Sequence, residues 1–157
     1  MAETARLVLV DSGEDLVHIK ELFIEYAKSL GVDLSFQGFE EELKSLPGKY
    51  SEPEGSIVLA LVGEKPAGCA ALRRITEQIC EMKRLYVRDE FRGVGLGREL
   101  ADRIIERAKE LDYKYIRLDT LPTMERAQDM YRDMGFYEIE PYIFNPVEGT
   151  KYLEKKL

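Results

Sequence analysis

The pattern of hydrophobic and polar positions predicts short strands interrupted by amphipathic helices. Three strand-like runs follow one another in the middle of the chain, over residues 56–63, 66–75 and 78–87. A few residues with turn signals separate them, and connections this short join neighbouring antiparallel strands. Residues 6–10 form a further strand-like run ahead of them. The pattern therefore predicts an antiparallel meander.

Apolar residues spaced three and four positions apart predict four helices. Ser12 and Asp15 resemble a capping box ahead of the first helix, and Gly31 and Gly135 stop the first and the last. A strand-like run at 113–121 follows the third helix, and a strand–helix–strand unit implies a parallel strand pair. The predicted helices cover residues 16–30, 39–46, 95–111 and 124–134, and further strand-like pieces lie at 136–144 and 150–157.

These elements predict an α+β fold in a single domain spanning residues 1–157. Its sheet is mixed and mostly antiparallel, with one parallel pair in the middle and helices flanking it. The chain has 157 residues, of which 45% are hydrophobic and 34% charged, which is typical of a globular domain. The longest apolar run, at 57–62, is far too short to cross a bilayer, and no leader pattern opens the chain. We expect a cytoplasmic protein with no membrane partner.

Cysteine and histidine usage argues against a metal centre. Two cysteines and one histidine cannot supply a four-ligand zinc site of the usual kind, so no metal is predicted. A hairpin turning about Thr76 would place Cys69 opposite Lys83 rather than Cys80. We therefore expect both thiols to be reduced.

The charge is unevenly distributed along the chain. The net charge is −7, yet residues 83–117 hold ten basic and seven acidic residues. An acidic chain is a poor candidate for nucleic-acid binding, which needs extended basic surfaces. A basic island of this size suits a small, localised anion instead.

A glycine-rich segment lies inside this basic island. Gly93, Gly95 and Gly97 lie between a strand and a long helix, with Arg92 and Arg98 beside them. Glycines allow an anion close to the backbone, and the unpaired N–H groups at a helix start point toward it. A diphosphate fits this arrangement. A dinucleotide-binding oxidoreductase is one alternative, with Asp119 as its ribose-binding acid. The glycine spacing and the neighbouring meander argue against that alternative.

Two motifs resemble the GCN5-related N-acetyltransferase (GNAT) superfamily. "RGVGLG" matches its R/Q-x-x-G-x-G/A pattern, and "ERAQDMYRDMGF" at 125–136 looks like its A-x-x-x-Y-x-x-x-G-F segment. The resemblance covers nearly the whole chain. It implies an enzyme that transfers an acetyl group from acetyl-CoA, its cosubstrate, to a primary amine of a small metabolite or peptide, by direct attack in a ternary complex.

The resemblance also assigns the residues that bind the cosubstrate. Backbone amides from Arg92 to Arg98 would hold the diphosphate. The end of the preceding strand would splay from its parallel neighbour and offer free backbone groups to the pantetheine arm. Met124 stands where the family often has an asparagine, so a non-catalytic CoA-binding module remains a second alternative. The implied binding residues are Leu85, Tyr86, Val87, Arg92, Gly93, Val94, Gly95, Leu96, Gly97 and Arg98.

Two residues are the catalytic candidates. Glu81 falls where one branch of the family places its general base, and Lys83 shares its strand face. A surface ion pair of these two is the alternative interpretation. Tyr131 matches the family's usual general acid, although an aromatic residue there could equally pack in the core.

The acceptor stays open at this point. The helices within 16–46 and the aromatic residues Tyr137, Tyr142 and Phe144 are expected to shape its pocket. The acidic N-terminal half favours a cationic acceptor, whereas basic residues such as Arg73 and Lys83 favour an amine that also bears a carboxylate. The expected partners are acetyl-CoA and this acceptor, and a homodimer is left open.

Overall fold

The computed structural model describes residues 4–31, 33, 34 and 38–157, and within them the strands form one seven-stranded sheet. The strand order is β1-β2-β3-β4-β5-β7-β6, and every neighbouring pair is antiparallel except β4 and β5. The predicted fold class is therefore confirmed. The strands are β1 (Ala5–Leu9), β2 (Ser56–Val62), β3 (Lys65–Arg74), β4 (Ile79–Val87), β5 (Tyr115–Thr120), β6 (Tyr137–Ile139) and β7 (Lys151–Lys156).

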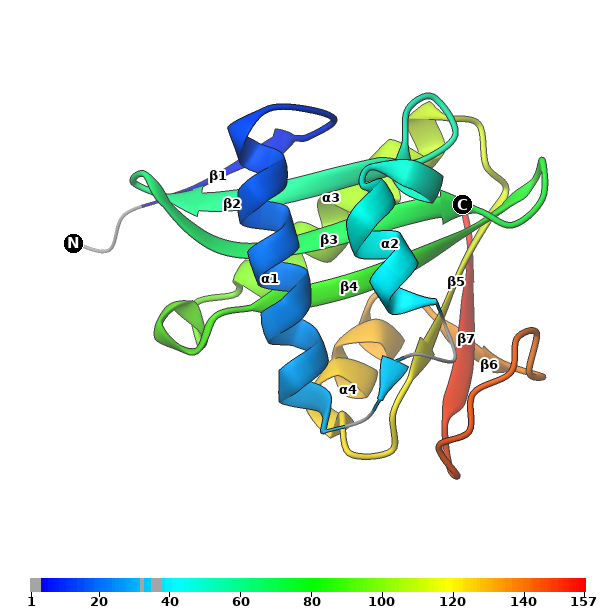
Figure 1. Ribbon diagram of the computed structural model, residues 1–157. Coiled ribbons are helices and arrows are strands. Elements are labelled where there is room, and N and C mark those ends of the chain that lie inside the picture. The colour runs from blue at the N-terminus through cyan, green and yellow to red at the C-terminus, as the bar shows by residue number, and fades with distance from the viewer. Residues whose placement is uncertain (1–3, 32, 35–37) are drawn as a thin grey trace.

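Helices cover both faces of the sheet (Figure 1). Helices α1 (Glu14–Leu30) and α2 (Phe39–Ser45) lie on one face, α3 (Leu96–Glu110) lies on the other, and α4 (Glu125–Asp133) packs at the α3 side. Short 3₁₀ turns, η2 (Gly48–Tyr50) and η3 (Asp89–Phe91), complete the described elements. Because both faces are covered, β2 is a continuous run of buried side chains rather than an alternating one.

The predicted helix ends are partly right. Helix α1 ends at Gly31, whose positive φ of 65° makes it the left-handed cap that glycine favours. The predicted capping box is wrong. Gly13 is the N-cap of α1, with φ at 80°, and the Ser12 hydroxyl donates to Asp11 instead. The extended turn before the helix removes Ser12 from the N-cap position.

A bulge interrupts the pairing of β3 with β4. Between the pairs Ala71↔Lys83 and Cys69↔Tyr86, two residues of β4 oppose one residue of β3, and Arg84 there has a φ of 61°. The expected pairing of Cys69 with Lys83 is wrong. The hairpin is centred one residue after Thr76, which moves the partner of Cys69 by two residues, and the bulge moves it by one more, to Tyr86. Both cysteines are free and buried.

The parallel pair of β4 and β5 is short. It extends from Ile79↔Tyr115 to Glu81↔Arg117, although β4 continues to Val87 and β5 to Thr120. Beyond that point the two strands diverge, and Figure 1 shows the wedge between them. The bulge lies in this unpaired part of β4, where it twists the strand away from its neighbour. The divergence leaves room between the strands for a ligand.

Candidate active site

A cavity of about 800 Å³ occupies the wedge between β4 and β5. The segment after β4 and the start of α3 line one end, and α1 with the ends of β4 and β5 lines the other. Helix α4 closes the side next to β5. The cavity therefore joins the glycine-rich segment to the face of the sheet that α1 covers.

The glycine-rich end of the cavity has the form that an anion requires. Gly93 and Gly95 have φ values of 86° and 83°, and a Cβ at either position would meet no atom within 4 Å. Gly95 is the N-cap of α3, and no side chain caps the helix. The first backbone N–H groups of α3 therefore have no partner within the helix and are positioned to bind an anion. Of the predicted loop residues, Val94 is 71% exposed and lies outside the cavity lining, whereas the others line it.

The two arginines of this segment are held at the rim. Arg92 donates from Nε to the Val87 carbonyl at 2.8 Å and pairs with Asp89 at 2.7 Å. Arg98 reaches across from α3 to Asp133 of α4 at 2.8 Å. Both side chains are exposed enough to exchange these partners for a phosphate. The Val87 carbonyl, in contrast, is already used by Arg92.

Tyr131 lines the cavity, as do Leu85, Tyr86 and Val87 of β4. Its ring is buried and lies 5.5 Å from that of Phe136, so the residue is part of the core and of the cavity wall at once. Burial raises the pKa of the Tyr131 hydroxyl, with smaller contributions from Tyr26 and Asp119. The hydroxyl is thus protonated at neutral pH and can donate a proton.

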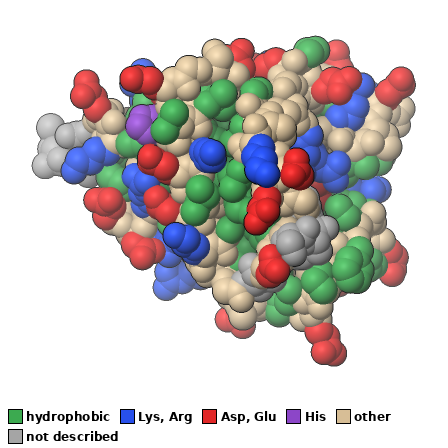
Figure 2. Space-filling view, in the orientation of Figure 1, with side chains coloured by type: hydrophobic (Ala, Val, Ile, Leu, Met, Phe, Trp, Pro, Cys, Tyr) green, Lys and Arg blue, Asp and Glu red, His purple; other side chains and the backbone are tan. Residues whose placement is uncertain are grey.

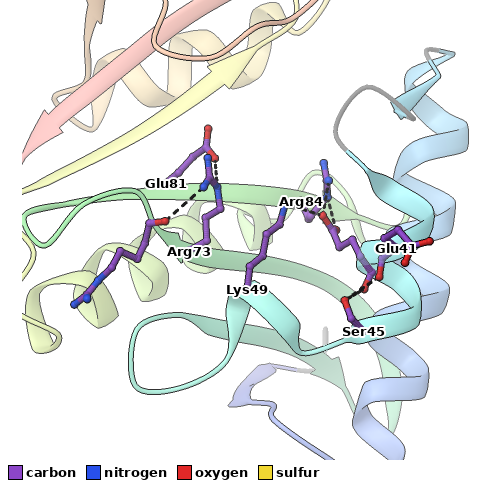
Figure 3. A network of polar contacts seen from close by, with 8 residues as sticks. Glu41, Ser45, Lys49, Arg73, Glu81 and Arg84 are labelled. Atoms are coloured by element: carbon purple, nitrogen blue, oxygen red, sulfur yellow. Dashed lines mark hydrogen bonds and ion pairs between the residues drawn. The ribbon is translucent and has the colours of Figure 1, made fainter.

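Glu81 lies behind the cavity rather than on its lining. It is 1% exposed, and its two carboxylate oxygens accept hydrogen bonds from Arg73 Nε at 2.7 Å and from the Tyr142 hydroxyl at 2.6 Å. Figure 3 shows Arg73 and Glu81 pointing toward one another from neighbouring strands. Tyr142 is half-buried and comes from the segment between β6 and β7. Tyr142 therefore connects the carboxylate with the segment between β6 and β7.

The end of the cavity next to α1 carries charged side chains, of which the sequence had singled out Lys83 for the acceptor. Lys83, Arg84 and Asp119 line it. Arg84 donates twice to Glu42 of α2, at 2.9 and 2.8 Å, and Lys49 lies 3.1 Å from the same carboxylate (Figure 3). The period of two along the strands places Lys83 on the face of Glu81, as the sequence predicts, and it also places Asp119 on the face of Arg117.

Burial and the charge of Arg84 together set the ionisation of the groups at this end. Desolvation lowers the pKa of Lys83 to about 8, against the opposing effect of Glu81 and with the help of Arg84. Burial would raise the pKa of Glu42, but the hydrogen bonds and charge of Arg84 outweigh it and hold the pKa below the ordinary 4.5. Asp119 accepts a hydrogen bond from Asn145 Nδ2 at 3.2 Å.

Of the other residues expected near the site, Met124 lines the cavity, whereas Tyr137 and Phe144 do not. Met124 is the N-cap of α4 and lines the cavity, with Thr120 Oγ1 3.8 Å from its sulfur. Tyr137 contacts Glu154 instead of the cavity, and Phe144 is 74% exposed. Within the segment 16–46, residues 32 and 35–37 lie outside the described part of the chain.

Comparison with known proteins identifies the class. The model of the acetyltransferase (GNAT) family matches residues 18–136. The chain is 38% identical to an uncharacterised N-acetyltransferase of Schizosaccharomyces pombe, over 92% of this chain and 90% of that one. It is 34% identical to an uncharacterised N-acetyltransferase of Dictyostelium discoideum, over 95% and 98%. The chain belongs to the GNAT acetyltransferase family.

Solved structures agree with this assignment at the level of the fold. An acetyltransferase of Streptococcus agalactiae superimposes with a TM-score of 0.80 at 24% identity, covering 98% of both chains. A GNAT family acetyltransferase of Elizabethkingia anophelis, determined with acetyl-CoA bound, superimposes with a TM-score of 0.67 at 20% identity, over 98% of each chain.

The predicted enzyme class is therefore confirmed, with acetyl-CoA as its cosubstrate. Neither alternative is favoured. Asp119, the acid that a dinucleotide-binding protein would use, lies near enough to Lys83, Tyr26 and Tyr131 to affect their pKa values, and none of these three belongs to the glycine-rich segment. Among the described residues, no group of three or more His, Cys, Asp and Glu side chains is placed to hold a metal ion. No helix in that part of the chain is long and apolar enough to span a bilayer.

Proposed function

We propose that the protein is an N-acetyltransferase that binds acetyl-CoA along the cavity and transfers the acetyl group to a primary amine entering from the α1 side. The observation that carries this proposal is the continuous cavity, which has unpaired helix N–H groups at one end and buried ionisable groups at the other. The diphosphate binds at the start of α3, with Arg92 and Arg98 at the rim. The pantetheine arm lies along the unpaired edge of β4, next to Leu85, Tyr86 and Val87.

The transfer needs a proton acceptor and a proton donor. The amine nitrogen attacks the thioester carbonyl, so that a C–N bond forms and the C–S bond breaks. Glu81 receives the proton of the amine, through Tyr142 or one water, because its carboxylate is buried behind the cavity. Tyr131 gives a proton to the departing thiolate, which its buried, protonated hydroxyl can do. The acceptor is thus activated on one side of the wedge and the thiolate is neutralised on the other.

Two measurements on the purified chain test the proposal. Acetyl-CoA and CoA are expected to raise the melting temperature, whereas NAD and NADP leave it unchanged, because a ligand that binds only the native state stabilises it. A panel of amines is then incubated with acetyl-CoA, and the released thiol is measured. Stabilisation by NAD alone, or the absence of thiol release with every amine, would contradict the proposal. A cytoplasmic location stays a prediction from the sequence, and the sequence leaves a homodimer open.

A further inference from the structure

Glu81 belongs to a row of side chains that crosses five strands of the sheet. The members of the row lie opposite one another in register, and they are Arg73 of β3, Glu81 of β4, Arg117 of β5, Glu154 of β7 and Tyr137 of β6. Arg73 Nε lies 2.7 Å from the Glu81 carboxylate. Arg117 Nε lies 2.8 Å from that of Glu154. Glu81 therefore has a cation opposite it on each neighbouring strand, which offsets the cost of burying its carboxylate.

Tyr142 covers this row where the parallel pairing of β4 and β5 ends. Its hydroxyl donates to Glu81 Oε2 at 2.6 Å, and the Arg117 guanidinium lies 5.2 Å from the centre of its ring. Arg73 donates to the other carboxylate oxygen, Oε1. The carboxylate is thus held at both oxygens by donors from two different segments. Because a carboxylate has about four acceptor positions, two donors fix its orientation and still leave it able to take up a proton.

The segment that carries Tyr142, between β6 and β7, is itself anchored to neighbouring strands. Asn145 Nδ2 donates to the carboxylate of Asp119 on β5 at 3.2 Å. The Tyr152 hydroxyl on β7 donates to the Ile143 carbonyl at 2.9 Å, and the Tyr152 ring lies 5.5 Å from that of Tyr142. One segment therefore binds a carboxylate on each of the two strands that diverge. Anchoring of this kind keeps a supporting side chain in one orientation.

The Tyr142 hydroxyl is a proton-bearing donor rather than a second base. Burial has the largest effect in raising the pKa of Tyr142, and the charge of Glu81 and the hydrogen bond to it raise it further. Asp119 acts in the same direction and Arg73 in the opposite one, both to a smaller extent. Tyr142 is not among the residues that line the cavity, so it acts through Glu81 and not on the amine.

We propose that Tyr142 is a positioning residue, which holds the Glu81 carboxylate in the orientation in which it takes up the proton of the amine through a water. This inference rests on the proposed acetyl transfer and selects between the two routes for that proton. The amine nitrogen gives a proton to the water, and the same water gives one to a Glu81 oxygen. A neutral amine and a protonated carboxylate result, while Tyr142 keeps its own proton throughout.

The test removes one hydroxyl group. Tyr142→Phe keeps the ring beside Arg117 and loses the hydrogen bond to Glu81. Tyr137→Phe is the matched control, because Tyr137 donates in the same way to Glu154, a different carboxylate of the same row. Both changes are made in the wild-type and the Glu81→Gln backgrounds. Thiol release with acetyl-CoA and the fastest amine of the panel gives kcat and KM, and acetyl-CoA stabilisation reports that each variant is folded.

The two backgrounds separate positioning from a merely structural role. Tyr142→Phe should lower kcat on the order of 10-fold, as expected for the loss of one hydrogen bond to a charged group, with KM for acetyl-CoA unchanged. In the Glu81→Gln background the same change should have no effect, because the group that Tyr142 positions can no longer act as a base. Tyr137→Phe should retain the kcat of its parent in both backgrounds.

The pH dependence gives a second readout. The loss in Tyr142→Phe should shrink in alkaline buffer, where the amine is already neutral. Each variant is compared with wild type at the same pH, because Lys83, whose pKa burial lowers to about 8, loses its charge over the same range in every protein. The ionisable groups that face or interact with Glu81 are Arg73, Lys83, Arg117, Tyr142, Tyr50 and Cys80.

Three results would overturn the inference and leave the acetyl transfer standing. A Tyr142→Phe profile that superimposes on that of wild type would give the hydroxyl no part in the reaction. An equal loss in both backgrounds would make its role structural. A loss as large as that of Glu81→Gln would make Tyr142 the group that carries the proton. Absence of acetyl-CoA stabilisation and of thiol release with every amine would instead overturn the proposed function, and this inference with it.

Discussion

Tyr131 shows that one side chain can serve both the core and the site. Its ring packs against Phe136, while its hydroxyl lines the cavity and has a pKa raised by burial. The spacing of helix residues alone could not separate the two roles, because both require an aromatic residue on the inward face. The structure makes them compatible, since the ring contributes to packing and the hydroxyl to chemistry.

Replacing Tyr131 by Phe should therefore separate chemistry from packing. We expect kcat to fall on the order of 10²-fold, which is typical for the loss of one acid–base group, with acetyl-CoA affinity and melting temperature retained. Steady-state kinetics and thermal shift measure these quantities. Because burial raises the Tyr131 pKa, the wild-type rate should show no loss of this donor on raising the pH to 10. Wild-type turnover by the variant would assign Tyr131 to the core alone.

Glu81 is a buried carboxylate with two donors, and its replacement by Gln tests proton transfer. Gln keeps the shape but cannot accept a proton, so kcat/KM should drop on the order of 10²- to 10⁴-fold near neutral pH. Activity should partly recover in alkaline buffer, where the amine is already neutral. The measurement is a pH–rate profile for wild type and Glu81→Gln. Asp119→Asn is measured beside them, because it removes a different carboxylate, one that lines the cavity. A Glu81→Gln profile that superimposes on that of wild type would place the base elsewhere.

At the scale of elements, the ion pair of Arg84 with Glu42 holds α2 against the bulge of β4. Arg84 lies at the positive φ of 61°, a conformation that a non-glycine residue adopts only when its surroundings enforce it. Its guanidinium contacts Glu42 of α2 through two hydrogen bonds and lies 5.3 Å from the Phe39 ring. The ion pair thus holds the strand at the point where it leaves β5, and so maintains the opening of the cavity.

Removing the carboxylate of this pair should be costly. We expect Glu42→Gln to destabilise the fold by about 3–5 kcal/mol at neutral pH, because it leaves a buried guanidinium without its counter-charge. Glu41→Gln is the control, since the exposed Glu41 carboxylate forms an ion pair with the exposed Lys44 at 3.9 Å, and its effect should be about 0–1 kcal/mol. Denaturant unfolding monitored by circular dichroism measures both.

The same pair predicts a dependence on pH. The Glu42 pKa is lower in the folded state than the ordinary 4.5, so its stabilisation is present above that pH and is lost as the pH falls further. The difference between wild type and Glu42→Gln should therefore shrink below about pH 4.5. A difference that stays constant down to pH 2 would show that folding does not lower the Glu42 pKa.

At the scale of the whole molecule, the site is assembled from segments that lie far apart in the sequence. The cavity takes its walls from α1, β4, the start of α3, β5 and α4, and Tyr142 reaches Glu81 from the segment before β7. Figure 2 shows acidic and basic side chains interspersed over the face that α1 covers, without a field of one sign. On this face no patch of one sign marks a binding surface, whereas the cavity between β4 and β5 is lined by charged and polar side chains.

Acetyl-CoA binding should consequently change the stability of the entire fold. A hundredfold excess over Kd adds about 2.7 kcal/mol, which raises the melting temperature of a domain of this size by roughly 5–10 °C. Gly95→Glu should abolish the shift, because a carboxylate at the start of α3 occupies and repels the diphosphate position. Gly13→Glu is the matched control: Gly13 is the N-cap of α1, with φ at 80° and open space around its Cβ position. An unchanged shift in Gly95→Glu would place the anion elsewhere.

The sequence by itself determined the elements and the local binding motif. Strand and helix periodicities, the stop at Gly31 and the glycines before α3 depend on interactions between residues close in the chain, so pattern reading recovers them. The likeness to the acetyltransferase family also followed from two such segments. The predicted capping box is wrong because Gly13, with φ at 80°, is the N-cap instead of Ser12. This too is an effect between residues close in the chain.

Only the tertiary structure decided the register, the order of strands and the acceptor end of the site. The bulge at Arg84 is held by a partner 42 residues away, and Lys83 and Asp119 line one cavity because β4 and β5 diverge after three paired positions. Placement of Glu81 behind the cavity likewise depends on Tyr142, 61 residues distant. Such contacts form between segments that are remote in the chain. They are stabilised by the pairing of charges that are buried together, and no local propensity encodes them.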